Sequence, residues 1–245
     1  PQALQAGLLT PFQYLCISDD TDLSDDSLWS GQKYNIERLA DKLCAKTRAQ
    51  LIVNALHKYL ADEYTCRALC FCVNKRHADF MAEQLRLYGF NAQSLTSDTP
   101  ADERKQLAKD LREGTLHYLC VVDIFNEGVD IPEVDTVLFL RPTESLTIFL
   151  QQLGRGLRLS AGKTELTVLD FVAQANRKYD FASRFRALTL QPEKNIQKQI
   201  KEGFTLLPLG CSIVMEKKAR QYILDNITSC LLYTSPSPRD VEESR

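Results

Sequence analysis

Short apolar runs alternate with longer amphipathic stretches along most of the chain. The apolar runs predict strands at Phe12–Ser18, Arg67–Val73, Ala92–Thr96, Leu116–Asp123, Thr136–Leu140 and Leu166–Phe171. The amphipathic stretches predict one or two helices within Asn35–Tyr64, and further helices at Lys75–Tyr88, Ala101–Arg112 and Thr143–Arg158. Strands separated by helices favour right-handed βαβ units, which predict an α/β fold with a parallel sheet and helices on both faces.

Composition changes this picture little. The chain has 245 residues, of which 44% are hydrophobic and 25% charged, as is typical of a globular protein of one or two domains. Its formal net charge of −2 gives no overall attraction for nucleic acid, so such a partner would need a local basic patch. No apolar run has the length of a membrane span, and no signal peptide is visible, so we expect a cytoplasmic protein.

The eight cysteines form no C-x-x-C pair. Cys70 and Cys72 alternate with Phe71 inside a predicted strand, which favours buried free thiols and no metal site. Zinc bound by Cys66, Cys70, Cys72 and a histidine is a less favoured alternative, because the spacing does not fit a zinc knuckle. Five aspartates within Asp19–Asp26 are expected to form a solvated loop rather than a metal site.

The most informative stretch is the predicted helix Thr143–Arg158, with Thr143 as its N-cap. At about 100° per residue, Gln151, Arg155 and Arg158 share one face. Gly154 would allow close approach to the helix backbone. Two guanidiniums projecting together suit a phosphoryl group, although a plain amphipathic helix with solvated arginines is the alternative. The opposite face is expected to be an apolar stripe of Leu146, Leu150, Leu153 and Leu157.

A second candidate is the loop Gly128–Pro132. Gly128 permits positive φ or close backbone approach, Asp130 supplies a carboxylate and Pro132 fixes the exit. The loop could hold a nucleotide ribose or phosphate, or it could be a simple turn. Ligands of parallel sheets bind where the strands end, and we expect Asn74, Ser97, Asp123 and this loop at that edge.

Three segments resemble motifs IV, V and VI of superfamily-2 helicases, in the order of that family: Arg67–Arg76 (RALCFCVNKR), Val121–Pro132 (VVDIFNEGVDIP) and Gln151–Arg158 (QQLGRGLR). The stretch DTVLFLRPTESLTIFLQQLGRGLR and Gly203–Ile213 resemble bacterial restriction-type members of the DEAD/DEAH-box helicases. The resemblance covers about Pro11–Ile227. It implies the second, C-terminal RecA-like domain of a nucleic-acid-dependent ATPase.

The resemblance also implies roles for individual residues. Gly128 and Asp130 match positions at the nucleotide ribose and phosphates. Arg158 matches the arginine finger and Arg155 a second contact to the γ-phosphate, so both are candidate catalytic residues. Gln151 and Gly154 complete the nucleotide-binding set. Contacts to the nucleic-acid backbone are implied for Asn74, Lys75, Thr96, Ser97 and Asp123.

The chain lacks a GxxxxGK[ST] P-loop and a DExH or DExD box. Gly162-Lys163-Thr164 is not a P-loop, because Leu157 stands where the first glycine is required. The resemblance places both missing motifs, with the magnesium ligands for ATP, in a first RecA-like domain upstream of Pro1. The chain alone is then inactive. Its implied partners are nucleic acid, with DNA favoured, the first RecA-like domain of the same polypeptide and a fused nuclease domain.

We therefore predict four segments. Residues 1–64 join the first RecA-like domain, 65–190 form the helicase C-terminal RecA-like domain, and 191–229 form a helical extension that begins a further domain. Residues 230–245 are expected to be a non-native tail, because Cys230–Asp240 resembles a translated sequencing adapter. Two alternatives stay open: a non-catalytic nucleic-acid-binding RecA-like module of a repair or restriction complex, and an unrelated doubly wound nucleotide-binding protein.

Overall fold

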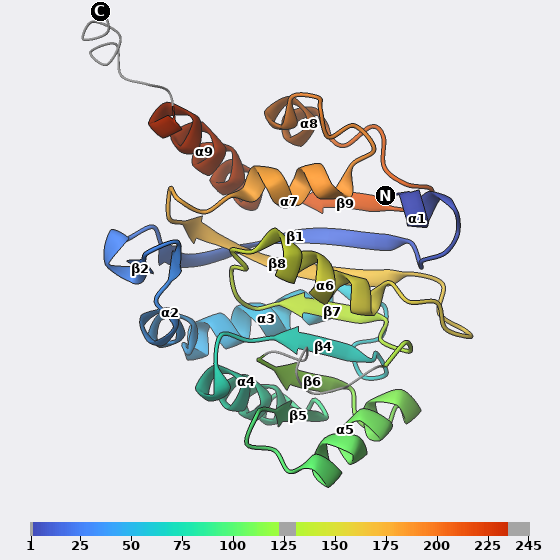
Figure 1. Cartoon of the computed structure of the whole chain (residues 1–245). Helices are drawn as coiled ribbons and strands as arrows, with labels where there is room; N and C mark the ends of the chain where they lie inside the picture. Colours follow the sequence, from blue (N-terminus) through green and yellow to red (C-terminus); the bar gives the residue numbers. More distant parts are fainter. Residues whose placement is uncertain (1, 123–130, 235–245) are drawn as a thin grey trace, which may run out of the picture.

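A parallel sheet of seven strands forms the centre of the molecule (Figure 1). The computed structural model describes residues 2–122 and 131–234, with side chains up to residue 230. The sheet order is β5-β6-β4-β7-β8-β1-β9, and every neighbouring pair is parallel. The strands are β1 (Phe12–Leu23), β4 (Ala68–Phe71), β5 (Ala92–Leu95), β6 (Tyr118–Val121), β7 (Thr136–Phe139), β8 (Leu166–Ala175) and β9 (Ser212–Met215). A separate antiparallel pair joins β2 (Trp29–Ser30) to β3 (Lys33–Tyr34).

Helices cover both faces of the sheet. They are α1 (Gln2–Gln5), α2 (Ile36–Leu43), α3 (Lys46–Tyr59), α4 (Lys75–Leu87), α5 (Ala101–Glu113), α6 (Leu146–Gly156), α7 (Phe181–Leu188), α8 (Ile196–Glu202) and α9 (Lys217–Thr234), with a 3-10 turn at Asp26–Leu28. Side chains alternate between the faces of a strand, so Leu69 and Phe71 pack with α5, α6 and α7, whereas Ala68 and Cys70 pack with α3 and α4. Both core layers are filled, which confirms the predicted α/β fold.

Strand β1 is longer than the sequence indicated. We predicted that it ends at Ser18 and that Asp19 begins a solvated loop, but β1 continues to Leu23 and Asp19 is buried. Arg48 of α3 donates to Asp19 at 2.7 Å and to the carbonyl of Leu140 at 2.9 Å. Burial alone would raise the pKa of Asp19, but the Arg48 guanidinium and hydrogen bonds from Thr21 lower it. The buried ion pair with Arg48 thus allows β1 to continue through Asp19 and into the aspartate-rich segment.

The cysteines in the central strands are free and buried, as predicted. Cys70, Cys72 and Cys120 are fully buried, and burial raises the pKa of the Cys72 thiol, which stays protonated. Within residues 2–122 and 131–230, no three histidine, cysteine or acidic side chains are placed to hold a metal ion.

Within the described residues, one strand from the N-terminal part of the chain and one from the C-terminal part join the central sheet. Strands β1 and β9 lie outside the predicted 65–190 core, yet both pair within the same sheet. The segment 191–229, predicted to be helical, contains β9 as well as α8 and most of α9. Helix α9 runs from Lys217 to Thr234 and so continues past Cys230, the residue at which the non-native tail is expected to begin. The four-segment division stays a prediction. None of the helices in the described part of the chain is long and apolar enough to cross a membrane.

Candidate functional site

Helix α6 carries most of the predicted nucleotide-binding residues, and it begins later than predicted. Its N-cap is Ser145, whose hydroxyl accepts from the amide of Ile148 at 3.3 Å. Thr143, the predicted N-cap, is instead buried, two residues before Ser145 in the chain. Its amide donates to the Tyr179 hydroxyl at 3.2 Å, and that hydroxyl donates to its carbonyl at 3.1 Å. The predicted N-cap at Thr143 is therefore wrong.

The buried face of α6 also differs from the predicted leucine stripe. Leu153 and Leu157 are buried as expected, but Leu146 and Leu150 are 37% and 41% exposed. Phe149 is fully buried in their place. The helix is thus rotated relative to the face that its leucines indicated.

Gly156 explains this rotation. A Cβ atom at Gly156 would lie 2.7 Å from Cδ1 of Leu166 and 3.1 Å from Cγ2 of Val137, so the helix backbone packs directly on β7 and β8. Gly154 has the opposite surroundings, because a Cβ atom there would meet nothing within 4 Å. The sequence singled out Gly154 for close approach, and the structure adds Gly156 as the glycine that packs on the sheet.

The two candidate catalytic arginines lie at the end of α6. Arg155 is in the last turn and half-buried, whereas Arg158 is exposed and lies two residues beyond Gly156, where the helix ends. The predicted end of the helix at Arg158 is therefore wrong, because Arg158 lies beyond the last turn of α6. Its carbonyl accepts from the Thr10 hydroxyl and from the Lys163 ammonium, each at 3.0 Å. Gln151 is exposed one turn before Arg155.

The end of α6 lies near the edge of the sheet where the strands begin. Lys163 also donates to the carbonyl of Pro132 at 3.1 Å, which brings the exit of the Gly128–Pro132 loop next to this end of the helix. Pro132 precedes β7, so our expectation that the whole loop lies where strands end is wrong for its exit. Three predicted site residues, Asp123, Gly128 and Asp130, lie outside the described residues.

The predicted nucleic-acid contacts lie at the opposite edge of the sheet, where β4 and β5 end. We refer to Asn74, Lys75, Thr96 and Ser97 as the strand-end rim. Lys75 forms an ion pair of 2.5 Å with Asp98, which joins the start of α4 to the loop after β5. Both side chains are largely exposed, at 47% and 74%. The structure therefore brings the described rim residues together.

Two rim side chains also support their own loops. Asn74 is the N-cap of α4 and accepts from the amide of His77 at 3.0 Å, while its Nδ2 donates to Glu37 at 3.1 Å. Thr96 is buried, and its hydroxyl accepts from the amide of Asp98 at 3.3 Å. Ser97 is exposed. Lys75 and Ser97 are thus the more accessible members of the rim.

A buried polar network packs against α6, and no pattern in the sequence predicts it. Arg184 of α7 donates to the hydroxyls of Tyr179 and Tyr14 at 2.7 and 2.8 Å, and to Asp170 at 3.1 Å. Its guanidinium carbon lies 4.4 Å from the ring centroid of Phe149 on α6. Burial raises the pKa of Tyr14 well above its ordinary value, so its hydroxyl stays a donor to Asp170. These residues come from distant parts of the chain, so no local spacing could reveal them.

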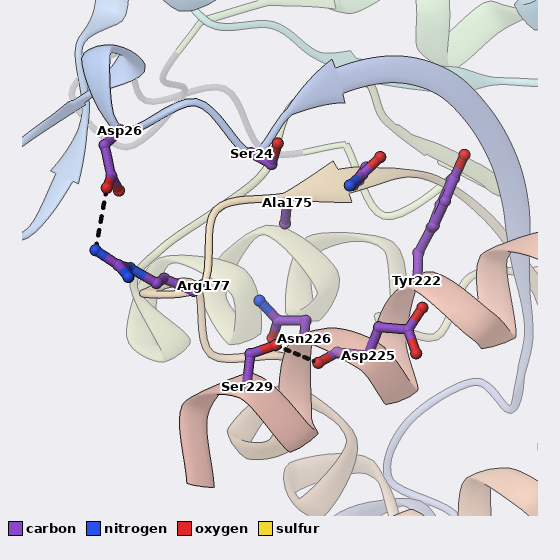
Figure 2. Close-up of a pocket in the computed structure, with 9 residues that line it drawn as sticks. Ser24, Asp26, Ala175, Arg177, Tyr222, Asp225, Asn226 and Ser229 are labelled. Carbon is purple, nitrogen blue, oxygen red and sulfur yellow. Dashed lines mark hydrogen bonds and ion pairs between the residues drawn. The ribbon is translucent and has the colours of Figure 1, made fainter. Parts of the chain in front are cut away.

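An open cavity of about 570 Å³ lies where β1 and β8 end. Figure 2 shows Arg177 directed toward Asp26, with which it forms an ion pair of 3.1 Å, beside Asp225 and Asn226 of α9. None of the predicted site residues lines this cavity. It is therefore separate from the end of α6 and from the strand-end rim.

The chain is similar in sequence to a helicase and to a restriction enzyme subunit. The chain is 28% identical over 165 residues to the Saccharomyces cerevisiae protein named "Putative ATP-dependent helicase IRC3", covering 67% of the chain and 24% of that protein. It is 25% identical over 201 residues to the type I restriction enzyme EcoKI endonuclease subunit of Escherichia coli, covering 76% of the chain and 17% of that subunit. The chain thus spans a quarter or less of these curated relatives.

A solved structure shares the fold. The ATP-dependent type ISP restriction-modification enzyme LlaBIII bound to DNA matches 99% of the chain and 18% of its own chain, with a TM-score of 0.52 and 15% sequence identity. The family model of the helicase conserved C-terminal domain matches residues 32–160, more than half of the 245 residues. The chain therefore belongs to the helicase conserved C-terminal domain family, and its sheet is the RecA-like sheet of superfamily-2 helicases.

Proposed function

We propose that this chain is the second motor domain of an ATP-dependent helicase or translocase that acts on DNA. The observation that carries the proposal is the meeting of two motifs: the end of α6, with Arg155 and Arg158, lies beside the motif V exit at Pro132. A helicase and two restriction enzymes among the similar proteins, one of them bound to DNA, support this assignment.

In the proposed mechanism, Arg158 is the arginine finger and Arg155 contacts the γ-phosphate of ATP beside it. Planar guanidiniums suit this task, because each offers several fixed donors to a group whose charge is spread over its oxygens. The open space at Gly154 fits a nucleotide close to the helix backbone. Gln151, Gly128 and Asp130 complete the proposed nucleotide contacts. The magnesium ligands and the P-loop belong to the first RecA-like domain, so the chain alone is inactive.

The strand-end rim and Asp123 form the proposed contact to the nucleic-acid backbone. A translocating motor must pass any sequence, so contacts to phosphate and sugar suit it better than contacts to base edges. The proposed partners are the first RecA-like domain of the same polypeptide and a fused nuclease domain. We propose a cytoplasmic protein.

The test is Arg158→Ala in the protein that carries both motor domains. The rate of ATP hydrolysis is expected to fall by about 10³–10⁵, the contribution that arginine fingers make in phosphoryl transfer, with binding of single-stranded DNA nearly unchanged. Arg158→Lys is expected to restore little, because an ammonium cannot replace the planar fork.

The matched control is Arg186→Ala, which removes an exposed arginine from α7. It is expected to leave hydrolysis unchanged. Near-normal hydrolysis by Arg158→Ala, together with lost affinity for DNA, would show that the end of α6 binds nucleic acid instead.

A further inference from the structure

Lys163 lies in the turn between α6 and β8, and its ammonium joins two segments of the proposed nucleotide site. It donates to the carbonyls of Gly156 and Arg158 at 2.5 and 3.0 Å, and to the carbonyl of Pro132 at 3.1 Å. Gly156 is the last residue of α6, and Arg158 lies two residues beyond it. Pro132 is the last residue of the motif V segment Val121–Pro132. One half-buried side chain therefore holds both motifs.

The chemistry of lysine fits this position. An ammonium has three N–H donors, and three carbonyl oxygens accept from it here. The last carbonyls of a helix carry no intrahelical partner and a partial negative charge, so a cation at this end is stabilising. A neutral side chain of the same length would leave these acceptors without the cation.

Arg158 needs such support because it lies beyond the helix. Its carbonyl accepts from the Thr10 hydroxyl as well as from Lys163, and the preceding carbonyl, of Leu157, accepts from the Thr10 amide at 2.8 Å. These bonds fix the backbone from which the Arg158 side chain projects. Misplacement of a catalytic group by about 1 Å can reduce a rate by about 10²-fold.

We propose that Lys163 is a positioning residue for the arginine finger. It holds the backbone of Arg158 against the motif V exit at Pro132, and it acts on catalysis through Arg158 rather than by touching the nucleotide. The part of this inference that concerns catalysis rests on the proposed function. The part that concerns the backbone of Arg158 does not.

The protonation of Lys163 gives a second way to test its role. The charged groups around it are Arg67, Glu133, Asp135, Arg158 and Glu165. Burial lowers the pKa of Lys163 to about 8, although Asp135 and Glu133 act to raise it. Above this pH the side chain becomes an amine with two N–H donors, which cannot serve three carbonyls.

Global stability responds to this deprotonation in the opposite direction. The pKa of Lys163 is lower in the folded chain than its ordinary value of 10.5, so the unfolded chain binds more protons between about pH 8 and 10.5. Through this group, stability therefore rises with pH in that window. Local loosening near Arg158 without loss of global stability is the expected signature.

The first experiment measures amide hydrogen exchange in the chain itself. In Lys163→Met, the protection factors of the Thr10 and Leu157 amides are expected to fall about tenfold, as for the loss of about one hydrogen bond, with the Cys70 amide of the central sheet unchanged. Lys198→Met, which removes an exposed lysine from α8, is the control. In the unmodified chain, the same two protection factors are expected to fall as pH rises through about 8.

The second experiment uses the protein with both motor domains. Lys163→Met is expected to lower kcat for ATP hydrolysis about tenfold, with less effect on KM. Because Lys163 acts through Arg158, the double variant with Arg158→Ala should be no slower than Arg158→Ala alone.

Each outcome has one meaning. Unchanged exchange at Thr10 and Leu157 overturns the proposal, and so does an equal loss of protection at Cys70, which would indicate a general role in stability. Additive losses of kcat in the double variant also overturn it. Normal hydrolysis by Arg158→Ala contradicts the proposed function instead, and leaves the exchange experiment to decide the role of Lys163.

Discussion

The end of α6 and the strand-end rim both present cationic side chains, but the fold holds them in different ways. At the end of α6, a half-buried lysine joins three main-chain carbonyls, and a buried arginine lies beneath the helix. At the rim, Lys75 pairs with Asp98 through two largely exposed side chains. One region is fixed through the backbone and the core, and the other through a surface ion pair.

This difference suits the two proposed tasks, which are contact with the phosphates of ATP at the end of α6 and contact with the nucleic-acid backbone at the strand-end rim. Phosphoryl transfer depends on the placement of charges to a fraction of an ångström, which buried and main-chain contacts can provide. A contact to a moving nucleic-acid strand has to form and break repeatedly. Exposed ion pairs contribute only about 0–1 kcal/mol and are screened by salt, so Lys75 can exchange Asp98 for a phosphate at little cost.

The largest expected effect comes from removing the buried charge beneath α6. Arg184→Met leaves Asp170 buried without its cationic partner, and we expect the free energy of unfolding to fall by about 3–5 kcal/mol. Urea unfolding followed by circular dichroism measures this loss.

Arg177→Met is the matched control, because Arg177 pairs with Asp26 through side chains that are 43% and 57% exposed. It should cost no more than about 1 kcal/mol. Equal losses from the two variants would remove the contrast between a buried support for α6 and surface pairs elsewhere.

A smaller effect is expected from the two glycines of α6. Gly156→Ala places a methyl group 2.7 Å from Leu166, and we expect a loss of about 1–3 kcal/mol from overpacking. Gly154→Ala meets open space and should stabilise the isolated chain by about 0.5–1 kcal/mol through the higher helix propensity of alanine. Thermal unfolding of both variants measures whether stability falls for Gly156→Ala and rises for Gly154→Ala.

In the protein with both motor domains, Gly154→Ala has a further expected result. If a nucleotide approaches the backbone at Gly154, the variant gains stability but loses ATP turnover. A gain in stability with unchanged turnover would contradict close approach at this position.

Most of the fold could be predicted from the sequence because its central strands are continuous apolar runs. Strands β4, β6 and β7 are buried on both faces, so each reads as an uninterrupted hydrophobic segment. The position of the strand-end rim could be predicted for a related reason, because its residues directly follow the apolar strands β4 and β5. The rim residues therefore lie together as expected.

Long-range contacts are what the sequence could not reveal. The extension of β1 depends on Arg48 reaching Asp19, and the rotation of α6 depends on Gly156 packing against Leu166. Lys163 belongs to Gly162-Lys163-Thr164, which matches only the last three positions of a P-loop. Its hydrogen bond to the carbonyl of Pro132 joins residues that are 31 positions apart in the sequence. In each case the contacting residues are distant in the sequence, and they come together only because the strands and helices pack into one sheet structure. Local spacing in the sequence therefore cannot predict these contacts.

The smallest effect is expected at the strand-end rim, where the sign is more informative than the size. Lys75→Ala should weaken binding of single-stranded DNA, and Asp98→Asn should strengthen it by releasing Lys75, each by about two- to fivefold, the range of an exposed ion pair. Fluorescence anisotropy across a salt series measures both, and Lys75→Ala should reduce the salt slope by about 0.7, as for one lost phosphate contact.

Lys109 and Glu113 form a comparable exposed pair on α5, and Lys109→Ala and Glu113→Gln should change neither affinity nor slope. Changes of the same sign for Lys75→Ala and Asp98→Asn would mean that the pair supports the loop and does not compete with phosphate. The contrast between a fixed end of α6 and an exchangeable rim would then be wrong at the rim.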